Sequence, residues 1–308
     1  MLDNKEEILS ITSEWTGERF PDGRPKVPDR YLDALYKMTL EELWKPVFTA
    51  GYTNQFIAMK ALHPEFTQDG EVNHKMVGRA VTAVYAPTRP DYYSASCKMA
   101  EKNGWQGLPN QWVMDRLSKR DVLVVDMYDK IYKGTFVGGN LTTALRTKTG
   151  NGGAVIWGGI RDVEQMQKVE DIQVYYRGID PTPIRDFAMT GLNTVARLGD
   201  GEHAAVCLPG DVVYGCSGGV LFIPPQLVVD VVENGQKTKV KDMFGFKMIS
   251  ENKFTTAQID RNVWTREMLD LLREYIRTAP EAAEYRDIDW TKEYELAMNS
   301  ADDQQSSL

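Results

Sequence analysis

Apolar residues in the middle of the chain fall into two patterns. Short runs rich in β-branched residues, bounded by glycine, proline or aspartate, predict strands. Between several of these runs, apolar residues recur at helical spacing and predict helices. The predicted strands cover 76–87, 121–126, 154–157, 172–176, 204–208, 211–215 and 220–223, and the predicted helices cover 110–117, 141–149 and 163–169. The pattern over 92–105 is ambiguous, although 94–102 fits a helix. These elements indicate an α/β protein.

Both ends of the chain have mainly helical patterns. Near the N-terminus, Thr39 and Glu42 fit a capping box at the start of a helix, and 19–28 is rich in proline, glycine and charge, which predicts an irregular arm. Near the C-terminus we expect a helix from Pro224 to Gly235, an amphipathic helix over 265–277 and a disordered polar tail over 300–308. The predicted organisation is a helical extension over 1–75, a core over 76–225 and a second helical extension with its tail over 226–308.

One segment carries most of the candidate chemistry. From Gly134 to Asp162, GTFVGGNLTTALRTKTGNGGAVIWGGIRD reads as a glycine turn, a helix, a buried strand and a second glycine turn. Asn140 is placed to cap the helix and Gly150 to end it. This order brings the helix N-terminus and the end of the strand to the same edge of a sheet. Arg161 and Asp162 are adjacent at this edge. The guanidinium of Arg161 can bind a carboxylate through two parallel hydrogen bonds, and the carboxylate of Asp162 is a hard oxygen ligand for a cation. With the helix N-terminus, they predict a small carboxylate bound beside a divalent cation.

Composition narrows the classes of function. The 308 residues are 42% hydrophobic, as in a globular protein with a real core, and their formal net charge of −8 disfavours general nucleic-acid binding. No window of about eighteen residues is wholly apolar. The start MLDNKEEILS also lacks the features of a signal peptide, so we expect no membrane span and a cytoplasmic location. Cys97, Cys207 and Cys216 lie far apart, which favours free thiols.

The common nucleotide-binding motifs and histidine metal-ligand spacings are absent from this sequence. GxxxxGK[ST] and GxGxxG are absent, so a nucleotide site is not expected. His63, His74 and His203 fall in no metal-ligand spacing, and we expect them at the surface or satisfied within the core.

Two separated motifs give the chain a family resemblance. The glycines from Gly138-Gly139 through Gly158-Gly159 lead to Arg161-Asp162, and PGDVVYGCSGGVLFIP follows over 209–224. In this order and spacing, residues 76–225 resemble the RraA-like superfamily, which includes regulators of ribonuclease activity and class II, metal-dependent aldolases for 4-hydroxy-4-methyl-2-oxoglutarate. The extensions look like those of a longer branch. The resemblance implies a layered α/β/β/α sandwich-like core and a homotrimer or homohexamer with the site between subunits.

The resemblance also implies a reaction. A 2-oxo acid would chelate Mg²⁺ or Mn²⁺, and the metal would stabilise the enolate formed by aldol cleavage or by decarboxylation of an oxaloacetate-type acid. Asp162 would hold the metal through water, and Arg161 would clamp the substrate. The turn at Gly139 and Asn140 and the backbone N–H groups of Leu141 and Thr142 would bind the remaining carboxylate oxygen.

The sequence departs from the family where the aldolases carry acids. The turn Gly138-Gly139-Asn140 has no acidic residue, and the acids expected near the PGD motif are replaced by Cys216-Ser217-Gly218. This departure leaves open weaker metal binding, another substrate, loss of catalysis, or an acid such as Asp230, Glu233 or Glu251 supplied by a neighbouring subunit. Two hypotheses follow, namely a carbon–carbon lyase and a non-catalytic regulator that binds a ribonuclease or another protein.

Several further residues have two interpretations. Arg177 is either a second anion contact or part of a structural ion pair. Asp126, at the end of a predicted strand, either faces a site or forms a turn. Tyr52, Phe56 and Phe66 either pack the N-terminal extension on its surroundings or help to close an active site.

Overall fold

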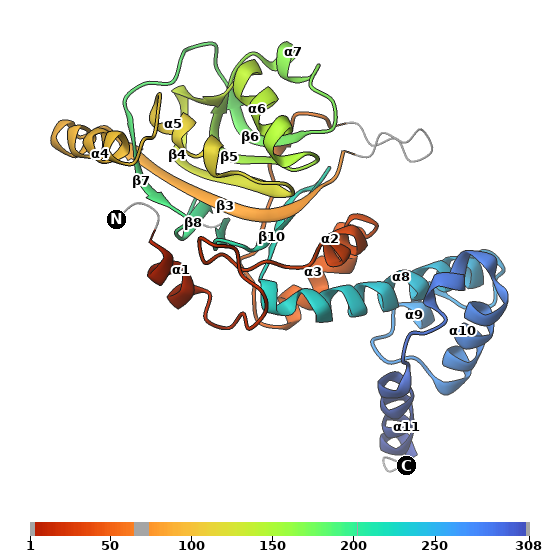
Figure 1. The fold of residues 1–308 in the computed structure, drawn as a ribbon. Coiled ribbons are helices and arrows are strands. Elements are labelled where there is room, and N and C mark those ends of the chain that lie inside the picture. The colour runs from red at the N-terminus through yellow and green to blue at the C-terminus, as the bar shows by residue number, and fades with distance from the viewer. Residues whose placement is uncertain (1–3, 65–73, 202, 306–308) are drawn as a thin grey trace. The chain divides into compact units, whose positions relative to one another are not determined.

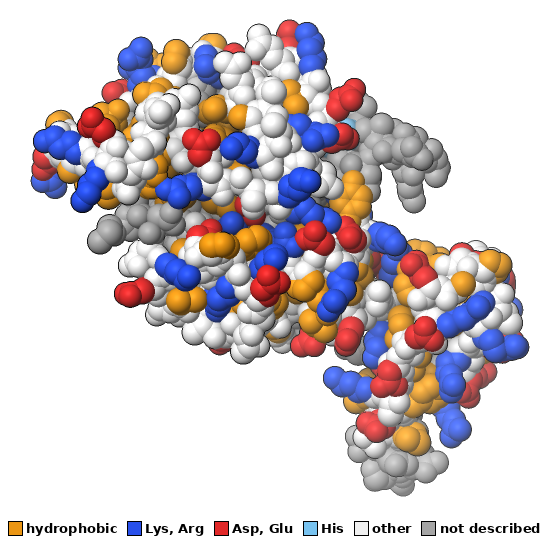
Figure 2. Space-filling model, in the orientation of Figure 1, with side chains coloured by type: hydrophobic (Ala, Val, Ile, Leu, Met, Phe, Trp, Pro, Cys, Tyr) orange, Lys and Arg blue, Asp and Glu red, His pale blue; other side chains and the backbone are white. Residues whose placement is uncertain are grey.

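The computed structural model describes residues 4–64, 74–201 and 203–305, with side chains up to residue 299 (Figure 1). The chain divides into two compact units, Met1–Val229 and Asp230–Leu308. None of the described helices is both long and apolar enough to cross a bilayer. In Figure 2, acidic and basic side chains are interspersed over the visible faces of both units.

A nine-stranded mixed sheet forms the centre of the first unit, in the order β1-β11-β10-β3-β4-β5-β6-β2, with β7 paired to β3. Strands β3 to β6 run parallel to one another, and the others in this sheet pair antiparallel. Two more strands, β8 and β9, form a separate antiparallel sheet. The strands are β1 (Phe56–Ile57), β2 (Lys60–Ala61), β3 (Met76–Pro87), β4 (Asp121–Val137), β5 (Gly153–Ile160), β6 (Gln173–Ile179), β7 (Phe187–Leu192), β8 (Ala196–Gly199), β9 (Ala204–Cys207), β10 (Val212–Cys216) and β11 (Gly219–Ile223).

Helices accompany the sheets in the first unit and make up the second. The first unit contains α1 (Lys5–Ile11), α2 (Asp29–Tyr36), α3 (Leu40–Thr49), α4 (Pro90–Lys102), α5 (Pro109–Trp112), η1 (Met114–Arg116), α6 (Gly139–Thr149), α7 (Val163–Met166) and η2 (Pro225–Leu227). Helix α8 (Val228–Ser250) leads into the second unit, which continues with α9 (Thr256–Ile259), α10 (Arg266–Thr278), η3 (Pro280–Tyr285) and α11 (Thr291–Gln305).

Two apolar clusters cover the faces of the large sheet. Leu123 and Val125 of β4 belong to the cluster that packs against α4 to α7. Their neighbours Val122 and Val124 point to the opposite face, where the cluster includes side chains of β8 and β9. Helices α1 to α3 lie on this second side (Figure 1). The predicted α/β class with its layered core is therefore confirmed.

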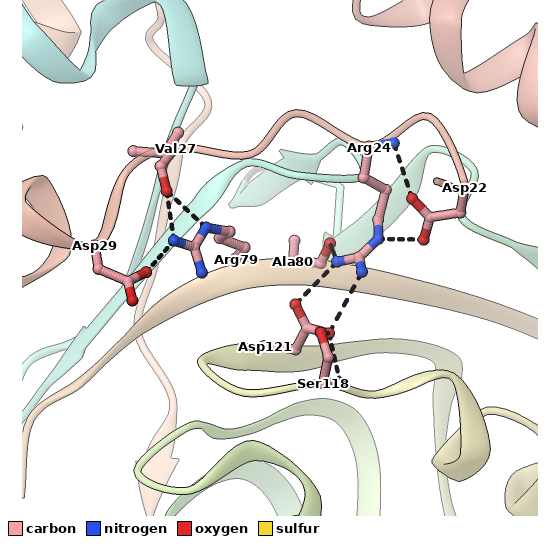
Figure 3. A network of polar contacts seen from close by, with 8 residues as sticks. All are labelled: Asp22, Arg24, Val27, Asp29, Arg79, Ala80, Ser118 and Asp121. Atoms are coloured by element: carbon pink, nitrogen blue, oxygen red, sulfur yellow. Dashed lines mark hydrogen bonds and ion pairs between the residues drawn. The ribbon is translucent and has the colours of Figure 1, made fainter. Parts of the chain in front are cut away.

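The irregular arm over 19–28 is fixed to the core by buried arginines (Figure 3). Arg24 Nη1 lies 3.0 Å from Asp121 Oδ1, and the two side chains are 2% and 0% exposed. Asp121 also accepts hydrogen bonds from the N–H and hydroxyl groups of Ser118, both at 2.8 Å. Arg79 of β3 in turn donates to the carbonyl of Val27 in the arm at 2.7 Å. The arm is thus part of the first unit's folded core.

Two predictions about the C-terminal end are wrong. Gly235 does not end the helix that follows Pro224, because α8 continues to Ser250. Its later turns supply Phe244, which packs against Trp264 and Tyr275 in the core of the second unit. The predicted disorder is also wrong over residues 300–305, which extend α11, since a helix already nucleated is extended at little cost. The rest of the tail, 306–308, lies outside the described residues.

Candidate functional site

The predicted glycine turn, helix and strand meet at one edge of the large sheet, but the helix begins earlier than predicted. Helix α6 starts at Gly139 with Gly138 as its N-cap residue, so the prediction that Asn140 caps it is wrong. The Thr142 N–H donates to the Gly138 carbonyl at 3.0 Å, and the buried Thr142 hydroxyl donates to the same oxygen. Thr142 is therefore not free to bind a substrate. The N–H groups without a partner inside the helix are those of its first residues, Gly139, Asn140 and Leu141.

Asp162 follows β5 in a left-handed backbone conformation, with φ 56° and ψ 36°. This conformation turns the chain directly into α7 and is unusual for a residue with a side chain. The Asp162 carboxylate lies against Gly138, where a Cβ atom would overlap its Oδ2. A Cβ on Gly139 would likewise lie 2.8 Å from Gln165 Oε1. The two glycines therefore allow the start of α6 to approach the turn that carries Asp162.

Arg161 and Asp162 are close to each other but only loosely paired. Arg161 Nε lies 3.8 Å from Asp162 Oδ2, and the two side chains are 40% and 34% exposed. A pair this open contributes little to stability. The Arg161 backbone N–H donates to the Val137 carbonyl at 3.1 Å, which fixes the position of the pair next to the turn before α6. Both side chains remain accessible to a ligand.

A cavity of about 270 Å³ adjoins this pair. Its walls include Gly138, Asn140, Leu141, Arg161 and Asp162, so the structure brings these predicted residues together. The sequence patterns do not single out the other lining residues. Leu108, Asn110, Gln111, Pro183 and Ile184 come from segments distant in the sequence. Thr135 and Phe136 directly precede the glycine turn, and Gln165 lies one turn after Asp162.

Asn110 is the most informative of these additional residues. Its side chain is 4% exposed, and its amide nitrogen donates to the Phe136 carbonyl at 2.9 Å. This bond fixes the orientation of the amide, and the buried Oδ1 has no hydrogen-bond partner among the described residues. A buried polar atom without a partner is costly, and each such atom calls for an explanation, such as a catalytic role or a bound water or ion.

The other candidate residues lie elsewhere. Arg177 Nε is 3.0 Å from Asp129 Oδ1, and the guanidinium stacks 4.2 Å from the ring centre of Trp157, which matches the ion-pair interpretation. Burial raises the pKa of Asp126, whose Oδ1 accepts the Tyr128 N–H at 3.0 Å and which does not line this cavity. Tyr52 and Phe56 do not line it either, and Phe66 lies outside the described residues.

The PGD motif forms a turn between β9 and β10, and the glycines after it form the turn between β10 and β11. Gly215-Cys216-Ser217-Gly218-Gly219 has the G-x-S-x-G spacing of a hydrolase nucleophile elbow. It lies, however, in the hairpin between β10 and β11, where Cys216 pairs with Gly219, and not between a strand and a helix. The strand–turn–helix geometry of a nucleophile elbow is therefore absent at Ser217.

Among the described residues that line the cavity, Asp162 is the only one with a carboxylate that could bind a divalent cation. The described residues contain no group of three or more His, Cys, Asp or Glu arranged to hold a metal. An Asp162 carboxylate that is one-third exposed fits a cation that keeps most of its water shell, as Mg²⁺ does. At the turn where the aldolases carry an acid, the cavity has the Asn140 amide. Asp230, Glu233 and Glu251 belong to the second unit.

Comparisons with known proteins identify a family. The model of the RraA-like family, described as Aldolase/RraA, matches residues 42–222. No curated protein sequence matches the chain significantly.

Among solved structures, an uncharacterised protein from Pseudomonas syringae pv. tomato has a TM-score of 0.58 at 17% identity, covering 77% of this chain and 100% of that one. A structure described as novel cellulases from gut-associated microbes has a TM-score of 0.58 at 18% identity, covering 78% and 96%. Streptomyces coelicolor RraAS2, described as an unusual member of the RNase ES inhibitor RraA protein family, has a TM-score of 0.54 at 17% identity, covering 72% and 97%. At these identities the structural matches show a shared fold only. The family match spans more than half of the sequence, and the chain therefore belongs to the RraA-like family.

Proposed function

We propose that this protein is a divalent-metal-dependent carbon–carbon lyase acting on a small 2-oxo acid, by aldol cleavage or decarboxylation. One observation carries the proposal. The Asp162 carboxylate and the Arg161 guanidinium, both partly exposed, lie at a cavity of about 270 Å³ beside the N-terminal end of α6. A carboxylate for a cation, a guanidinium fork for an anion and free helix N–H groups are what a 2-oxo acid with its metal requires.

Each group has a role in this proposal. Arg161 binds the substrate carboxylate through its planar fork, and the first N–H groups of α6, at Gly139, Asn140 and Leu141, bind the remaining oxygen. Asp162 would hold Mg²⁺ or Mn²⁺ through water. When bound, the cation supplies a Lewis acid for the electrons released as the carbon–carbon bond breaks. Leu141 and Ile184 contribute apolar surface to the cavity wall.

The cavity of one chain has no evident group to transfer a proton. Its lining contains Asp162 as the single acidic residue and Arg161 as the single basic one among the residues that the structure describes. We therefore infer that a neighbouring subunit completes the site in a homotrimer or homohexamer. Measuring the mass of the assembly in solution tests this inference, and an active monomer would contradict it.

The activity is tested directly by pyruvate release. The purified full-length chain, incubated with Mg²⁺ and either oxaloacetate or 4-hydroxy-4-methyl-2-oxoglutarate, should release pyruvate. Asp162→Asn should abolish that release. The matched control is Asp171→Asn, because Asp171 is exposed and its carboxylate pairs with Arg146, away from the cavity. No release by the wild-type chain across a broad panel of 2-oxo acids with metal present would contradict the proposal.

A second function is favoured by one specific observation. The turn Gly138-Gly139-Asn140 lacks the acid of the aldolases, and a similar fold occurs in a Streptomyces coelicolor protein described as a member of an RNase inhibitor family. A non-catalytic regulator would bind a ribonuclease or another protein partner and need no metal. Co-purification with a ribonuclease, together with no Mg²⁺ or Mn²⁺ binding by calorimetry, would favour this second function over the lyase.

A further inference from the structure

A second cavity in the first unit is lined in part by Asp211, an acidic residue that the proposed reaction does not use. Asp211 is 2% exposed and closes a turn in which its N–H donates to the Leu208 carbonyl at 3.1 Å. Its Oδ2 accepts the Leu208 N–H at 2.8 Å. The described residues bring no other hydrogen-bond donor and no ion-pair partner to this carboxyl group. A buried carboxyl with one partner is poorly compensated if it is ionised.

The cavity next to Asp211 has a volume of about 330 Å³. Its lining includes the acids Asp211 and Glu14 and, among the described residues, no lysine, arginine or histidine. Arg19 binds the Thr12 hydroxyl at 2.7 Å but lines a different cavity. The remaining walls are largely apolar and include Leu208 and Val206. The cavity therefore combines two acidic side chains, and no basic one among its described lining residues, with a hydrophobic surface.

Gln55 adds a fixed acceptor to the same walls. Its amide nitrogen donates to the Phe222 carbonyl at 3.0 Å and to the Val206 carbonyl at 3.2 Å. These two bonds leave Oε1 as the free end of the amide, and it accepts no hydrogen bond from the residues that the structure describes. Asp211 and Gln55 thus offer two acceptors and no donor to a ligand in this cavity.

Part of the cavity wall is formed by segments outside the matched family region. Gln226 Nε2 lies 3.1 Å from both Glu14 Oε2 and the Tyr52 hydroxyl. These two contacts connect η2, which contains Gln226, to the segment after α1 and to the segment after α3. Residues 11–14 and 224–226 line the cavity but fall outside the family match over 42–222. This cavity therefore depends on the chain's own extensions.

We propose that this cavity binds a small primary alkylammonium ion, with Asp211 as its counter-ion. The ammonium group supplies three donors for Asp211 and Gln55, and the alkyl group lies against the apolar walls. A divalent metal is disfavoured, because it would need several oxygen ligands and the described residues contain no group of three or more His, Cys, Asp or Glu arranged to hold a metal ion.

The protonation of Asp211 gives this binding a measurable signature. Burial raises the pKa of Asp211 to about 7, although the Leu208 N–H lowers it. The titratable groups around it are Glu14 and Tyr52 in the cavity wall and Cys207, whose thiol pKa is raised by burial and by Asp211. A cation that binds the ionised carboxylate must displace a proton from the fraction that carries one. Binding near neutral pH should therefore release protons.

Calorimetry with n-butylammonium chloride tests the proposal on the full-length chain. We expect saturable binding near pH 7, with an apparent enthalpy that changes with the ionisation enthalpy of the buffer. Asp211→Asn should weaken this binding at least about tenfold and remove the buffer dependence. The variant keeps a side-chain oxygen for the Leu208 N–H, so its fold should be retained. Val206→Phe, which narrows the cavity from its partly exposed wall, should also weaken binding.

Three outcomes would overturn the proposal. The first is that the wild-type chain binds no n-butylammonium at millimolar concentration. The second is that Asp211→Asn binds n-butylammonium as tightly as the wild-type chain. Binding of neutral n-butanol as tight as that of the ammonium ion would show that charge plays no part. Pyruvate release from a 2-oxo acid is independent of this cavity and should be unchanged in Asp211→Asn.

Discussion

The carboxylate of Asp162 occupies the space that a Cβ atom would need on Gly138, the residue that precedes helix α6. The turn before the helix and the turn after β5 therefore form one unit, although twenty-three residues separate Gly138 from Asp162 in the sequence. Any side chain at position 138 would displace the acid or the neighbouring Arg161, whose Cγ atom would lie 3.1 Å from the added Cβ. The close approach of these two residues gives the first prediction.

Gly138→Ala should reduce activity more than stability. The added methyl group overlaps Asp162 Oδ2, and small-to-large changes in packed sites cost about 1–3 kcal/mol. We expect kcat/KM for pyruvate release to fall at least about tenfold, with a modest loss in thermal midpoint. Gly201→Ala is the control, since no atom lies within 4 Å of a Cβ placed there. Equal activity of the two variants would contradict the proposed arrangement.

Arg161→Lys should raise KM while Arg177→Lys should not. Lysine cannot reproduce the planar fork of a guanidinium, and losing one charge-assisted hydrogen bond costs about 1.5–3 kcal/mol, or roughly 10- to 150-fold in affinity. Arg177 is held by Asp129 and Trp157 away from the cavity, so its replacement should leave KM within about twofold. Steady-state kinetics with the same 2-oxo acid compares them. A larger rise in KM for Arg177→Lys would point to a different anion site.

Arg24→Ala should destabilise the first unit strongly. The change leaves Asp121, which is fully buried, without its cation, and breaking a buried pair in this way costs about 3–5 kcal/mol. Lys26→Ala is the matched control in the same arm, because its pair with Glu18 is largely exposed and worth less than about 1 kcal/mol. Urea unfolding measures both free energies. Similar values for the two variants would mean that the arm does not depend on Arg24.

The free energy of unfolding should decrease as the pH rises from about 4 to about 7, because of the buried carboxyl group of Asp211. An unfolded aspartate loses its proton near pH 4, whereas burial raises the pKa of Asp211 to about 7 in the folded chain. Between these values the folded state holds more protons than the unfolded state, so the free energy of unfolding decreases as pH rises. The fall should amount to a few kcal/mol and should be absent in Asp211→Asn. Urea unfolding of the wild-type chain and of Asp211→Asn at several pH values tests this prediction. The same change in the free energy of unfolding with pH in both proteins would contradict it.

The sequence predicts the elements better than it predicts their ends. The strand over 76–87 matches β3, because a β-branched run bounded by proline is a local signal. The sequence predicts that the helix from Pro224 ends at Gly235, but α8 continues to Ser250. A glycine alone does not stop a helix whose later residues pack into a distant core. The start of α6 also differs from the prediction, because its N-cap residue is Gly138 and not Asn140.

The candidate site was predictable only where its residues are neighbours in the sequence. The motif predicts Arg161 and Asp162 as site residues, and the structure places both at the wall of one cavity. Asn110 and Ile184 were missed because tertiary packing alone brings them to this wall. The same holds for the Arg24 to Asp121 pair, in which an irregular arm supplies the partner of a strand residue far along the chain. Local patterns carry no information about such contacts.

The most direct test of the central claim is a crystal structure of the protein grown with Mn²⁺ and oxalate, a 2-oxo acid enolate analogue. We predict an anomalous manganese peak beside Asp162, either at about 2 Å or one water further away, with oxalate bound between the metal and Arg161. Placement of the metal at another site, or Arg161 and Asp162 both remote from a bound oxalate, would contradict the account.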